Sequence, residues 1–554
     1  MPTQVEQLET ALMAAIGRAL DSGSLKGAAP ESIKLERPKD RTHGDYASSI
    51  ALQLAKPAGM NPREVAQIIA DQLIGVDGIS KVDIAGPGFI NITLNRASQA
   101  ALVETILKST KDFGKGNALA GVKINLEFIS ANPTGPLHLG HTRWAAVGDA
   151  LGRVLTAAGA QVTREFYIND RGNQMDYFGQ SVEAVALGNP VPENGYQGEY
   201  IKDLAADVVA QNAGIKDLPA DDRFVAFREA AYQLQLMDQQ RVLDTFNTHF
   251  DVWFSERSLH DQGAVEHGME KLRAQGHVFE VDGAVWLRTT DFGDDKDRVM
   301  TKSDGSLTYF SSDTAYYINK RERGFDICIY MLGADHHGYI GRLKATAACA
   351  GDNPEYNIHI LIGQLVKIME GGEEVKLSKR AGTIITLEEL VEKVGVDAAR
   401  YTLIRYPVDT PMVMDLDVLK RNTNENPVYY VQYAHARIAA VLRNAQELGA
   451  ALELKDFDPA QLSHDRENEL LGALAEFPRV VSSAAEFREP HRIARYLEEL
   501  AGTYHGFYND CRVLPMGDEQ LTALHTARLL LCTATKQVIS NGLDLLGVSA
   551  PERM

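Results

Sequence analysis

The 554-residue chain has few cysteines and no long uninterrupted apolar segment, and both shortages exclude classes of protein. No two of the four cysteines form a CxxC pair; they are Cys328, Cys349, Cys511 and Cys532. This spacing argues against a disulfide framework and against a thiolate zinc site, so we expect core cysteines and no structural metal. No uncharged apolar run reaches about eighteen residues, so we expect no membrane-spanning helix.

Positive charge is also scarce, because 56 lysines and arginines stand against 75 aspartates and glutamates, a formal net charge of -19. A polyanionic partner needs local basic side chains, but the overall charge says little about one face of a protein. The composition therefore neither supports nor excludes RNA binding. The first segment carries Glu6 and Glu9 at helical spacing instead of the basic and apolar regions of a signal peptide, so we expect a cytoplasmic protein.

Common phosphate-binding loops are missing as well. Neither a Walker A pattern nor a glycine-rich kinase loop occurs, so Asp291-Phe292-Gly293, a kinase-like tripeptide, is expected to be a turn. A different phosphate site is predicted within residues 126–159, LEFISANPTGPLHLGHTRWAAVGDALGRVLTAAG. The pattern predicts a buried strand over 123–129, a tight loop over 132–136, and a helix from near Leu137 to a stop at Gly159.

His138 and His141 are three residues apart, so they are expected to share one face of the first turn of this helix. Unpaired backbone N–H groups and the helix dipole attract anions there, and two imidazole donors suit a polyphosphate. Gly140 would let a flat group such as a purine lie against the backbone. Alone, two such histidines are more often caps or surface residues.

A second phosphate-binding signal is the basic run 375–383, VKLSKRAGT, which follows Gly371 and Gly372. Flanking glycines suggest a movable loop, in which Lys376 and Lys379 provide point charges for oxygens of a departing phosphate. In isolation this run would be read as a solvated surface loop.

Together, HLGH and KLSKR resemble the paired signatures of class I aminoacyl-tRNA synthetases. The wider segments EFISANPTGPLHLGH, FYINDRGNQ, LGADHHGY and DAARY are similar to arginyl-tRNA synthetases, over nearly the whole chain. The departures are small: Leu139 and Leu377 replace isoleucine and methionine, Arg380 replaces the last serine, and Ala399 replaces leucine in the family's DALR. Both signature lysines are present, so we expect a competent enzyme.

The resemblance implies ATP-dependent activation of L-arginine to arginyl-adenylate and transfer to the 3' end of tRNA(Arg), releasing AMP and pyrophosphate. It implies Mg²⁺ with the nucleotide, and a need for bound tRNA before arginine is activated. Activation needs no side-chain nucleophile, because the amino acid carboxylate is already ionised. We expect a monomer.

The resemblance also assigns site residues. The implied catalytic donors are His138, His141, Lys376 and Lys379. The implied ATP-binding residues are His138, Gly140, His141, Gly333, Asp335, His336, Gln364, Val366, Lys376, Ser378 and Lys379. The implied arginine-binding residues are Glu127, Ser130, Asn132, Glu256, Tyr309, Asp313 and His337. The signature region comprises Ala131, Asn132, Pro133, Thr134, Gly135, Pro136, Leu137, His138, Leu139, Gly140 and His141.

Some assignments stay open. A buried guanidinium needs carboxylate partners, which favours the acidic set, but which of His336 and His337 touches substrate is undecided. Phe89 and Asn91 are the implied tRNA contacts, with core packing an equal alternative for Phe89. The tyrosines at helical spacing, Tyr430 and Tyr433, are expected to be core.

The predicted architecture is α/β, with a Rossmann-like parallel-sheet catalytic core between an N-terminal α+β domain and a C-terminal all-α helical bundle. The domains are predicted over 1–115, 121–396 with an insertion at about 171–310, and 397–554. Further expected elements are a short strand 32–35, a helix 61–74, a strand 82–94 interrupted by Gly86-Pro87-Gly88, strands 161–168, 250–256, 327–332 and 358–368, a hairpin 299–310, and helices 387–394, 426–445 and 527–546.

Two other function classes fit the sequence less well. A different nucleotidyltransferase with the same HxGH site would leave the helical C-terminal part unexplained. A non-enzymatic tRNA-binding protein would lack one of the phosphate-binding pairs, and both are present in the sequence. Cysteinyl or methionyl specificity would favour a zinc site, and glutamyl or glutaminyl specificity would need a cationic pocket.

Overall fold

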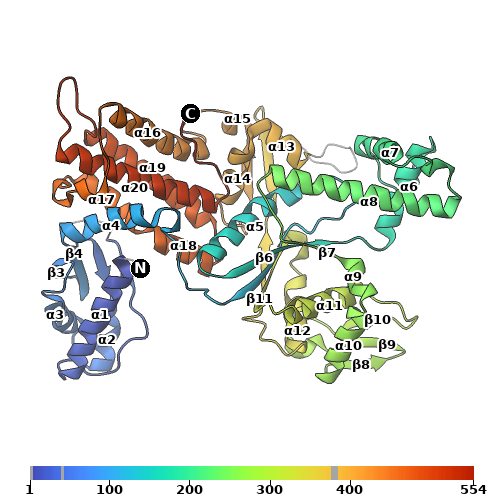
Figure 1. Cartoon of the computed structure of the whole chain (residues 1–554). Coiled ribbons are helices and arrows are strands. Elements are labelled where there is room, and N and C mark those ends of the chain that lie inside the picture. The colour runs from blue at the N-terminus through green and yellow to red at the C-terminus, as the bar shows by residue number, and fades with distance from the viewer. Residues whose placement is uncertain (1–3, 39–42, 376–384) are drawn as a thin grey trace.

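The computed structural model describes residues 4–38, 43–375 and 385–554, apart from the side chains of residues 96–100. Residues 4–94 form a small α+β unit with its own hydrophobic core, shown in blue in Figure 1. Its elements are α1 (Gln4–Asp21), β1 (Leu35–Glu36), β2 (Tyr46–Ser48), α2 (Ile50–Ala58), α3 (Pro62–Leu73), β3 (Ile79–Ala85) and β4 (Phe89–Leu94). The strands form one antiparallel sheet in the order β1-β2-β4-β3.

Two expectations for this unit need correction. The segment 82–94 is not one interrupted strand but part of an antiparallel pair, in which Ile84 of β3 lies opposite Ile90 of β4. Gly86 and Gly88, at φ +50° and +142°, adopt backbone conformations that let the chain reverse between them. The strand expected at 32–35 instead covers Leu35–Glu36, where the backbone pairs with β2.

The central part of the chain is built on a five-stranded parallel sheet in the order β12-β11-β5-β6-β7. Its strands are β5 (Lys123–Glu127), β6 (Gln161–Ile168), β7 (Val252–Ser255), β11 (Ile327–Gly333) and β12 (Ile358–Gly363). From β5 the chain moves to β6 on one side and later returns to β11 on the other. This reversal of strand order makes the carboxyl ends of β5 and β11 the expected ligand-binding edge.

Helix α5 (Leu139–Ala157) connects β5 to β6 and packs between the sheet and α14 (Val396–Ile404). Its apolar positions Trp144, Val147, Leu151 and Leu155 are all buried, as their spacing predicts. Gly148 allows the helix to approach β5 closely, because a Cβ there would lie 2.3 Å from the ring of buried Phe128.

The segment 171–310, predicted as one insertion, contains a strand of the main sheet, β7. Two blocks therefore leave the core separately (Figure 1). The first is a helical arm of α6 (Asn173–Ala186), α7 (Glu199–Gln211) and α8 (Ala220–Thr245). The second contains α9 (Glu256–Asp261), α10 (Ala264–Ala274) and a sheet of β8 (Val278–Val281), β9 (Ala284–Leu287) and β10 (Arg298–Thr301), followed by α11 (Tyr309–Glu322) and, after β11, α12 (Tyr339–Cys349).

The hairpin predicted over 299–310 is confirmed only as a short turn. Thr301 and Leu307 form an isolated antiparallel bridge, and the Lys302 and Thr308 N–H groups donate across the turn to the Ser306 and Met300 carbonyls, at 2.8 and 3.0 Å. The strand β10 pairs instead with β9, and α11 begins at Tyr309. The single strand predicted over 358–368 is wrong. It divides at Gln364 into β12 and β13 (Val366–Glu370), because β13 turns to pair with β15 (Met412–Asp415) and β14 (Glu373–Glu374) in a separate sheet.

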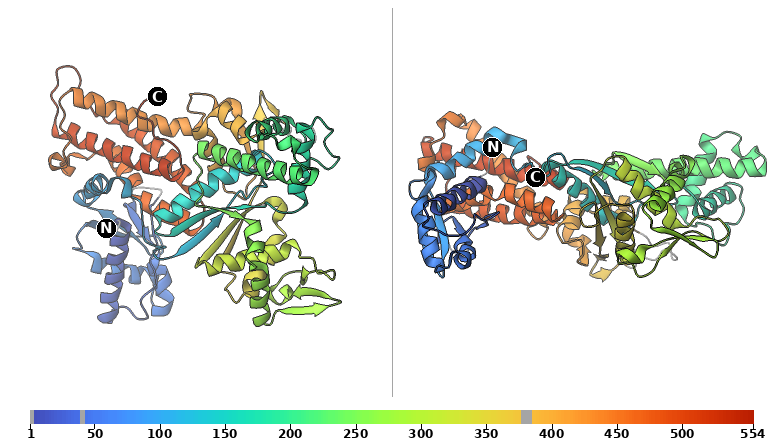
Figure 2. Two further views of the ribbon diagram at one scale, coloured as in Figure 1. Left: turned by 45° about the vertical axis from the view of Figure 1, so that its right-hand side comes forward. Right: turned by 90° about the horizontal axis from the view of Figure 1, so that it is seen from below.

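The C-terminal part is a helical bundle, interrupted only early by β15. Its helices are α13 (Leu387–Val394), α14, α15 (Leu416–Leu419), α16 (Pro427–Glu447), α17 (Asp465–Ala475), α18 (Phe477–Glu486), α19 (His491–Asp510) and α20 (Ala523–Leu545). Helix α4 (Arg96–Ser109) packs on α17 and α20, so the N-terminal unit and the bundle lie at one end of the molecule and the helical arm at the other (Figure 2). The expected fold class is confirmed.

Glycine substitutions test this packing. Gly148→Ala is expected to lower the free energy of unfolding by about 1–3 kcal/mol, because the new methyl group overlaps Phe128. Gly17→Ala, in the interior of α1 with no atom within 4 Å of the added Cβ, is the matched control and should stabilise by about 0.5–1 kcal/mol. Urea unfolding followed by circular dichroism measures both; equal effects of the two substitutions would contradict this packing.

Candidate active site

The first turn of α5 is capped by its own two histidines. His138 is the N-cap residue, and its Nδ1 accepts a hydrogen bond from the Gly140 N–H at 3.1 Å. The Nδ1 of His141 accepts from the His138 N–H at 3.3 Å, and the two rings lie 4.1 Å apart. A neutral imidazole that accepts at Nδ1 carries its proton at Nε2, on the far side of the ring. Both rings are therefore set up as Nε2–H donors.

Gly140 serves this cap directly. A Cβ at this position would lie 3.0 Å from Cε1 of His138, so any side chain would press on the ring. The expected role of Gly140 against a purine remains a prediction, and its role beside the imidazole is a second reason for glycine.

The loop between β5 and α5 is held in an uncommon conformation. Ile129 and Ser130 have φ values of +68° and +45°, which few residues other than glycine adopt and which recur at functional sites. Ser130 Oγ donates to the Glu127 carboxylate at 3.0 Å and accepts from the Tyr167 N–H at 3.2 Å. The loop is thus fixed to the carboxyl ends of β5 and β6.

The helical arm supports the same loop from the other side. Gln239 of α8 donates to the carbonyls of Asn132 and Gly135, at 3.1 and 2.8 Å. Tyr200 of α7 donates to the Thr134 carbonyl at 3.1 Å. The side chain of Asn132 is exposed, and its amide donates to Gln174 of α6 at 2.6 Å.

Lys376, Ser378 and Lys379 lie outside the described residues, but the chain that follows them reaches the first signature. Ile385 accepts from the Leu139 N–H at 3.1 Å, and Leu387 donates to the Leu137 carbonyl at 2.9 Å. This pairing places Ile385 and Leu387 beside the start of the HLGH helix.

Three predicted arginine-binding carboxylates lie close enough to one another to interact electrostatically. Glu127 ends β5, Glu256 begins α9 and Asp313 lies on α11; the first two are buried and the third is half-buried. Desolvation, then the charges of Glu127 and Glu256, raise the pKa of Asp313 to about 7, against a lowering effect of Arg342. Desolvation and the charge of Asp170 raise the pKa of Glu256. Such an environment favours a cation that can pair with the carboxylates.

Glu127 already has a cationic partner that the sequence did not reveal. The Nζ of Lys320, a fully buried residue on α11, lies 2.5 Å from Glu127 Oε2. The same ammonium sits over the rings of Tyr316 and Tyr330, at 4.2 and 3.9 Å from their centroids. Glu127 is therefore neutralised from inside the protein, and the guanidinium partner is expected among the other carboxylates.

The remaining predicted residues lie around the same sheet edge. Tyr309 is 76% exposed one turn before Asp313, on the same face of α11. Gly333 ends β11, and Asp335, His336 and His337 follow it with exposed side chains. Gln364 follows β12, but its N–H donates to the Val408 carbonyl at 2.8 Å, and Val366 is paired with β15. An adenine contact by the Gln364 N–H would require this bond to break.

The predicted tRNA contacts differ in exposure. Phe89 is 38% exposed beside the Gly86–Gly88 turn, whereas Asn91 is 5% exposed in the middle of β4. Asn91 thus presents almost no surface to a base, and only Phe89 stays available.

Sequence reasoning also missed an aromatic surface on the bundle. Tyr433, expected in the core, is 37% exposed and stacks on Tyr429 with centroids 6.0 Å apart. Arg437 lies over the ring of Tyr508 at 4.2 Å, and His505 of α19 packs against Tyr433. Val431 and Ala434, on either side of Tyr433 in the sequence, are buried. This alternation is the sequence signal that could have predicted an exposed Tyr433.

Within residues 4–38, 43–375 and 385–554, no three histidine, cysteine, aspartate or glutamate side chains are arranged to hold a metal ion. In the same part of the chain, no helix is both long and apolar enough to cross a membrane.

Lys320→Met tests the internal charge pair. We expect a loss of about 3–5 kcal/mol in the free energy of unfolding, because Glu127 would stay buried without its cation. Lys202→Met removes an exposed ion pair with Glu199, 63% and 75% exposed, and should have no measurable effect. Urea titrations of both variants measure the free energy of unfolding. An unaltered midpoint for Lys320→Met would show that the ion pair does not stabilise the fold by this amount.

Comparison with known proteins follows the same division of the chain. Residues 6–94 match the family model described as arginyl tRNA synthetase N terminal domain, residues 102–434 match tRNA synthetases class I (R), catalytic domain, and residues 431–554 match DALR anticodon binding domain. The chain is 53% identical over 552 residues to the arginine–tRNA ligase of Paenarthrobacter aurescens, covering 99% of this chain and 100% of that protein. It is 55% identical over 547 residues to that of Frankia alni, covering 99% of each.

Solved structures agree on the fold. The arginyl-tRNA synthetase of Thermus thermophilus superimposes with a TM-score of 0.77 at 21% identity, covering 99% of both chains. That of Plasmodium falciparum superimposes with a TM-score of 0.74 at 16% identity, covering 100% of both. The family models and the close relatives together show that this chain belongs to the arginyl-tRNA synthetases of class I.

Proposed function

We propose that this chain is an arginine–tRNA ligase whose active site lies at the carboxyl ends of β5 and β11. It activates L-arginine with ATP as arginyl-adenylate and transfers the arginyl group to the 3' end of tRNA(Arg), releasing AMP and pyrophosphate. Two observations carry this proposal: the histidine-capped start of α5, which follows β5, and the group of interacting carboxylates formed by Glu127, Glu256 and Asp313. One suits a polyphosphate and the other a guanidinium.

In the first step the arginine carboxylate attacks the α-phosphorus of ATP, and the bond to the β-phosphate oxygen breaks. Catalysis then consists of positioning and of stabilising charge on phosphate oxygens. The Nε2–H groups of His138 and His141 provide two donors, and Lys376 and Lys379 remain the predicted cations for the leaving pyrophosphate. Mg²⁺ would enter with ATP and neutralise part of its charge, and no residue of the chain is assigned to it.

The acidic pocket supports arginine as the amino acid. Glu256 and Asp313 are the carboxylates left for the guanidinium once Lys320 has neutralised Glu127. Tyr309 and His337 have exposed side chains, and in this proposal Ser130 and Asn132 of the loop meet the amino or carboxylate end of the substrate. In the second step, a terminal ribose hydroxyl of tRNA attacks the adenylate carbonyl, and AMP leaves.

RNA would contact both end domains in this proposal. Phe89 on the N-terminal unit and the surface of Tyr429, Tyr433, His505 and Tyr508 with Arg437 on the bundle offer aromatic faces for unpaired bases. The division at 1–115, 121–396 and 397–554 is supported by a separate core in residues 5–94 and by the parallel sheet in residues 123–363. A monomeric, cytoplasmic enzyme remains our expectation from the sequence.

ATP–pyrophosphate exchange, measured with each proteinogenic amino acid with and without tRNA, tests the function. We expect exchange with arginine only, and only when tRNA is present. Exchange supported by lysine or glutamine but not by arginine would overturn the specificity, and full exchange with arginine in the absence of RNA would refute the dependence on tRNA.

The arginine KM is expected to depend on pH through Asp313. Because its pKa is raised to about 7 in the free protein and a guanidinium favours the ionised carboxylate, arginine binding should weaken as pH falls. The KM for arginine should rise about tenfold between pH 8 and pH 6, since each unit below the pKa removes most of the ionised form. Asp313→Asn should raise this KM at pH 8 and flatten its pH profile, with the KM for ATP as the internal control. A wild-type arginine KM that is constant over this range would contradict the assignment.

A further inference from the structure

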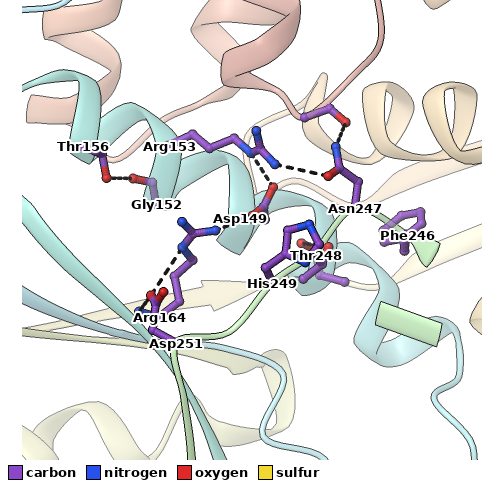
Figure 3. A network of polar contacts seen from close by, with 12 residues as sticks. Asp149, Gly152, Arg153, Thr156, Arg164, Phe246, Asn247, Thr248, His249 and Asp251 are labelled. Atoms are coloured by element: carbon purple, nitrogen blue, oxygen red, sulfur yellow. Dashed lines mark hydrogen bonds and ion pairs between the residues drawn. The ribbon is translucent and has the colours of Figure 1, made fainter. Parts of the chain in front are cut away.

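Asp149 lies on α5, three turns after His138, and is fully buried. Its carboxylate accepts from three arginines: Arg400 Nη2 at 2.6 Å, Arg153 Nε at 2.7 Å and Arg164 Nη1 at 3.1 Å. Figure 3 shows Asp149 between the last two, with Arg164 reaching on to Asp251. None of these residues belongs to the active site described above. A buried carboxylate would repel a phosphate, so phosphate binding does not explain Asp149.

Arg400, the arginine of the DAAR segment on α14, is also fully buried. Besides Asp149, its guanidinium donates to the carbonyls of Phe246, Asn247 and Leu546 and to Thr248 Oγ1, at 2.9 to 3.2 Å. A planar fork with five N–H donors can satisfy these acceptors together, which a lysine ammonium cannot do. Gly547 is required beside it, because a Cβ there would lie 2.3 Å from Arg400 Nη2.

The contacts of Asp149 and Arg400 join five parts of the chain: α5, α14, β6 through Arg164, residues 246–248 and residues 546–547. Phe246–Thr248 connect α8 to β7, and Leu546 and Gly547 follow α20, the last helix of the bundle. Asn247, at φ +56°, accepts from Arg153 at 3.4 Å and donates to the Gly547 carbonyl at 2.9 Å (Figure 3). Thr248 Oγ1 in turn donates to the carbonyl of Ala145 on α5 at 3.1 Å. The end of the bundle is thereby bonded to the helix that presents the two catalytic histidines.

Stability alone is a poor explanation for such a pair. A buried ion pair is often no more stabilising than apolar side chains of the same volume, because desolvation offsets the attraction. Directional bonds from a rigid fork do, however, fix one orientation of the helices that they join. Helix α5 is a rod of 1.5 Å per residue, so a tilt at Asp149 is carried about 16 Å to His138. A displacement of the order of 1 Å at the reacting groups costs about a hundredfold in rate.

We propose that Asp149 and Arg400 are positioning residues for arginine activation, which fix α5 against the end of the bundle and so aim His138 and His141 at the transferring phosphate. The proposal rests on the proposed function. It predicts that weakening the pair lowers the rate of the chemical step and spares arginine binding, because Glu256 and Asp313 lie on α9 and α11 and not on α5.

Arg400→Lys tests this with a matched control. The substitution keeps a positive charge beside Asp149 but removes the fork. Arg405→Lys is the control, because Arg405 ends the same helix and makes a two-pronged ion pair with Glu498 of α19, at 2.7 and 2.8 Å, without touching α5. ATP–pyrophosphate exchange with arginine and tRNA gives kcat and KM, and active-site titration by adenylate formation gives the competent fraction. Both assays are made on variants that circular dichroism shows to be folded.

We expect kcat per active site to fall 10- to 100-fold for Arg400→Lys, with the arginine KM and the tRNA Kd within twofold of wild type, and kcat of Arg405→Lys within threefold. An unchanged kcat per active site, even with a smaller competent fraction, would mean a merely structural role and overturn the proposal. Equal losses in both variants would do the same.

Should Arg400→Lys fail to fold, Asn247→Gly decides. This substitution keeps the positive φ of residue 247, which glycine adopts readily. It removes only the side-chain amide that hydrogen-bonds to Arg153 and to the Gly547 carbonyl. A fall of threefold or more in kcat per active site supports the proposal, and wild-type kcat refutes it. Absence of arginine-dependent exchange in the wild-type protein would instead count against the proposed function itself.

Discussion

The backbone amides at the start of α5 are the constraint from which the active site follows. The N–H groups of the first turn of a helix need acceptors, and here the acceptors are the Nδ1 atoms of His138 and His141. Meeting that need leaves the proton of each neutral ring on Nε2, which is the donor that we propose for a phosphate oxygen. Gly140 keeps the space that the first ring occupies. In the proposed site the same two rings thus serve as a helix cap through Nδ1 and as phosphate donors through Nε2.

Charge imposes the second constraint, on the other side of the site. Burial, followed by the charge of Glu256, raises the pKa of the Tyr167 hydroxyl. Burial, followed by the charges of Glu127 and Glu256, also raises the pKa of Asp313. Lys320 compensates the charge of Glu127 permanently. Asp313, whose pKa is raised to about 7, is only partly ionised at neutral pH. In the proposed site a guanidinium would favour its ionised form, so recognition of a cationic side chain and exclusion of a neutral one would be a single electrostatic effect.

Much of this arrangement could be predicted from the sequence, because the motifs sit where hydrophobic strands end. The buried runs at 123–127 and 327–333 gave the sheet edge, and the spacing of His138 and His141 gave the helix face. Contacts between distant residues could not be predicted. No local pattern pairs Lys320 with Glu127 or Gln239 with the loop at Asn132. The strand predicted over 358–368 failed for the same reason, since its division depends on β15 as a partner.

The position of bound arginyl-adenylate decides whether the two constraints serve one reaction. A crystal structure with a non-hydrolysable analogue of that intermediate measures this directly. We predict that the guanidinium lies within hydrogen-bonding distance of Asp313 or Glu256 and that Nε2 of His138 or His141 donates to the phosphate. An analogue bound elsewhere, or one whose guanidinium faces solvent while these carboxylates stay unpaired with it, would contradict the account.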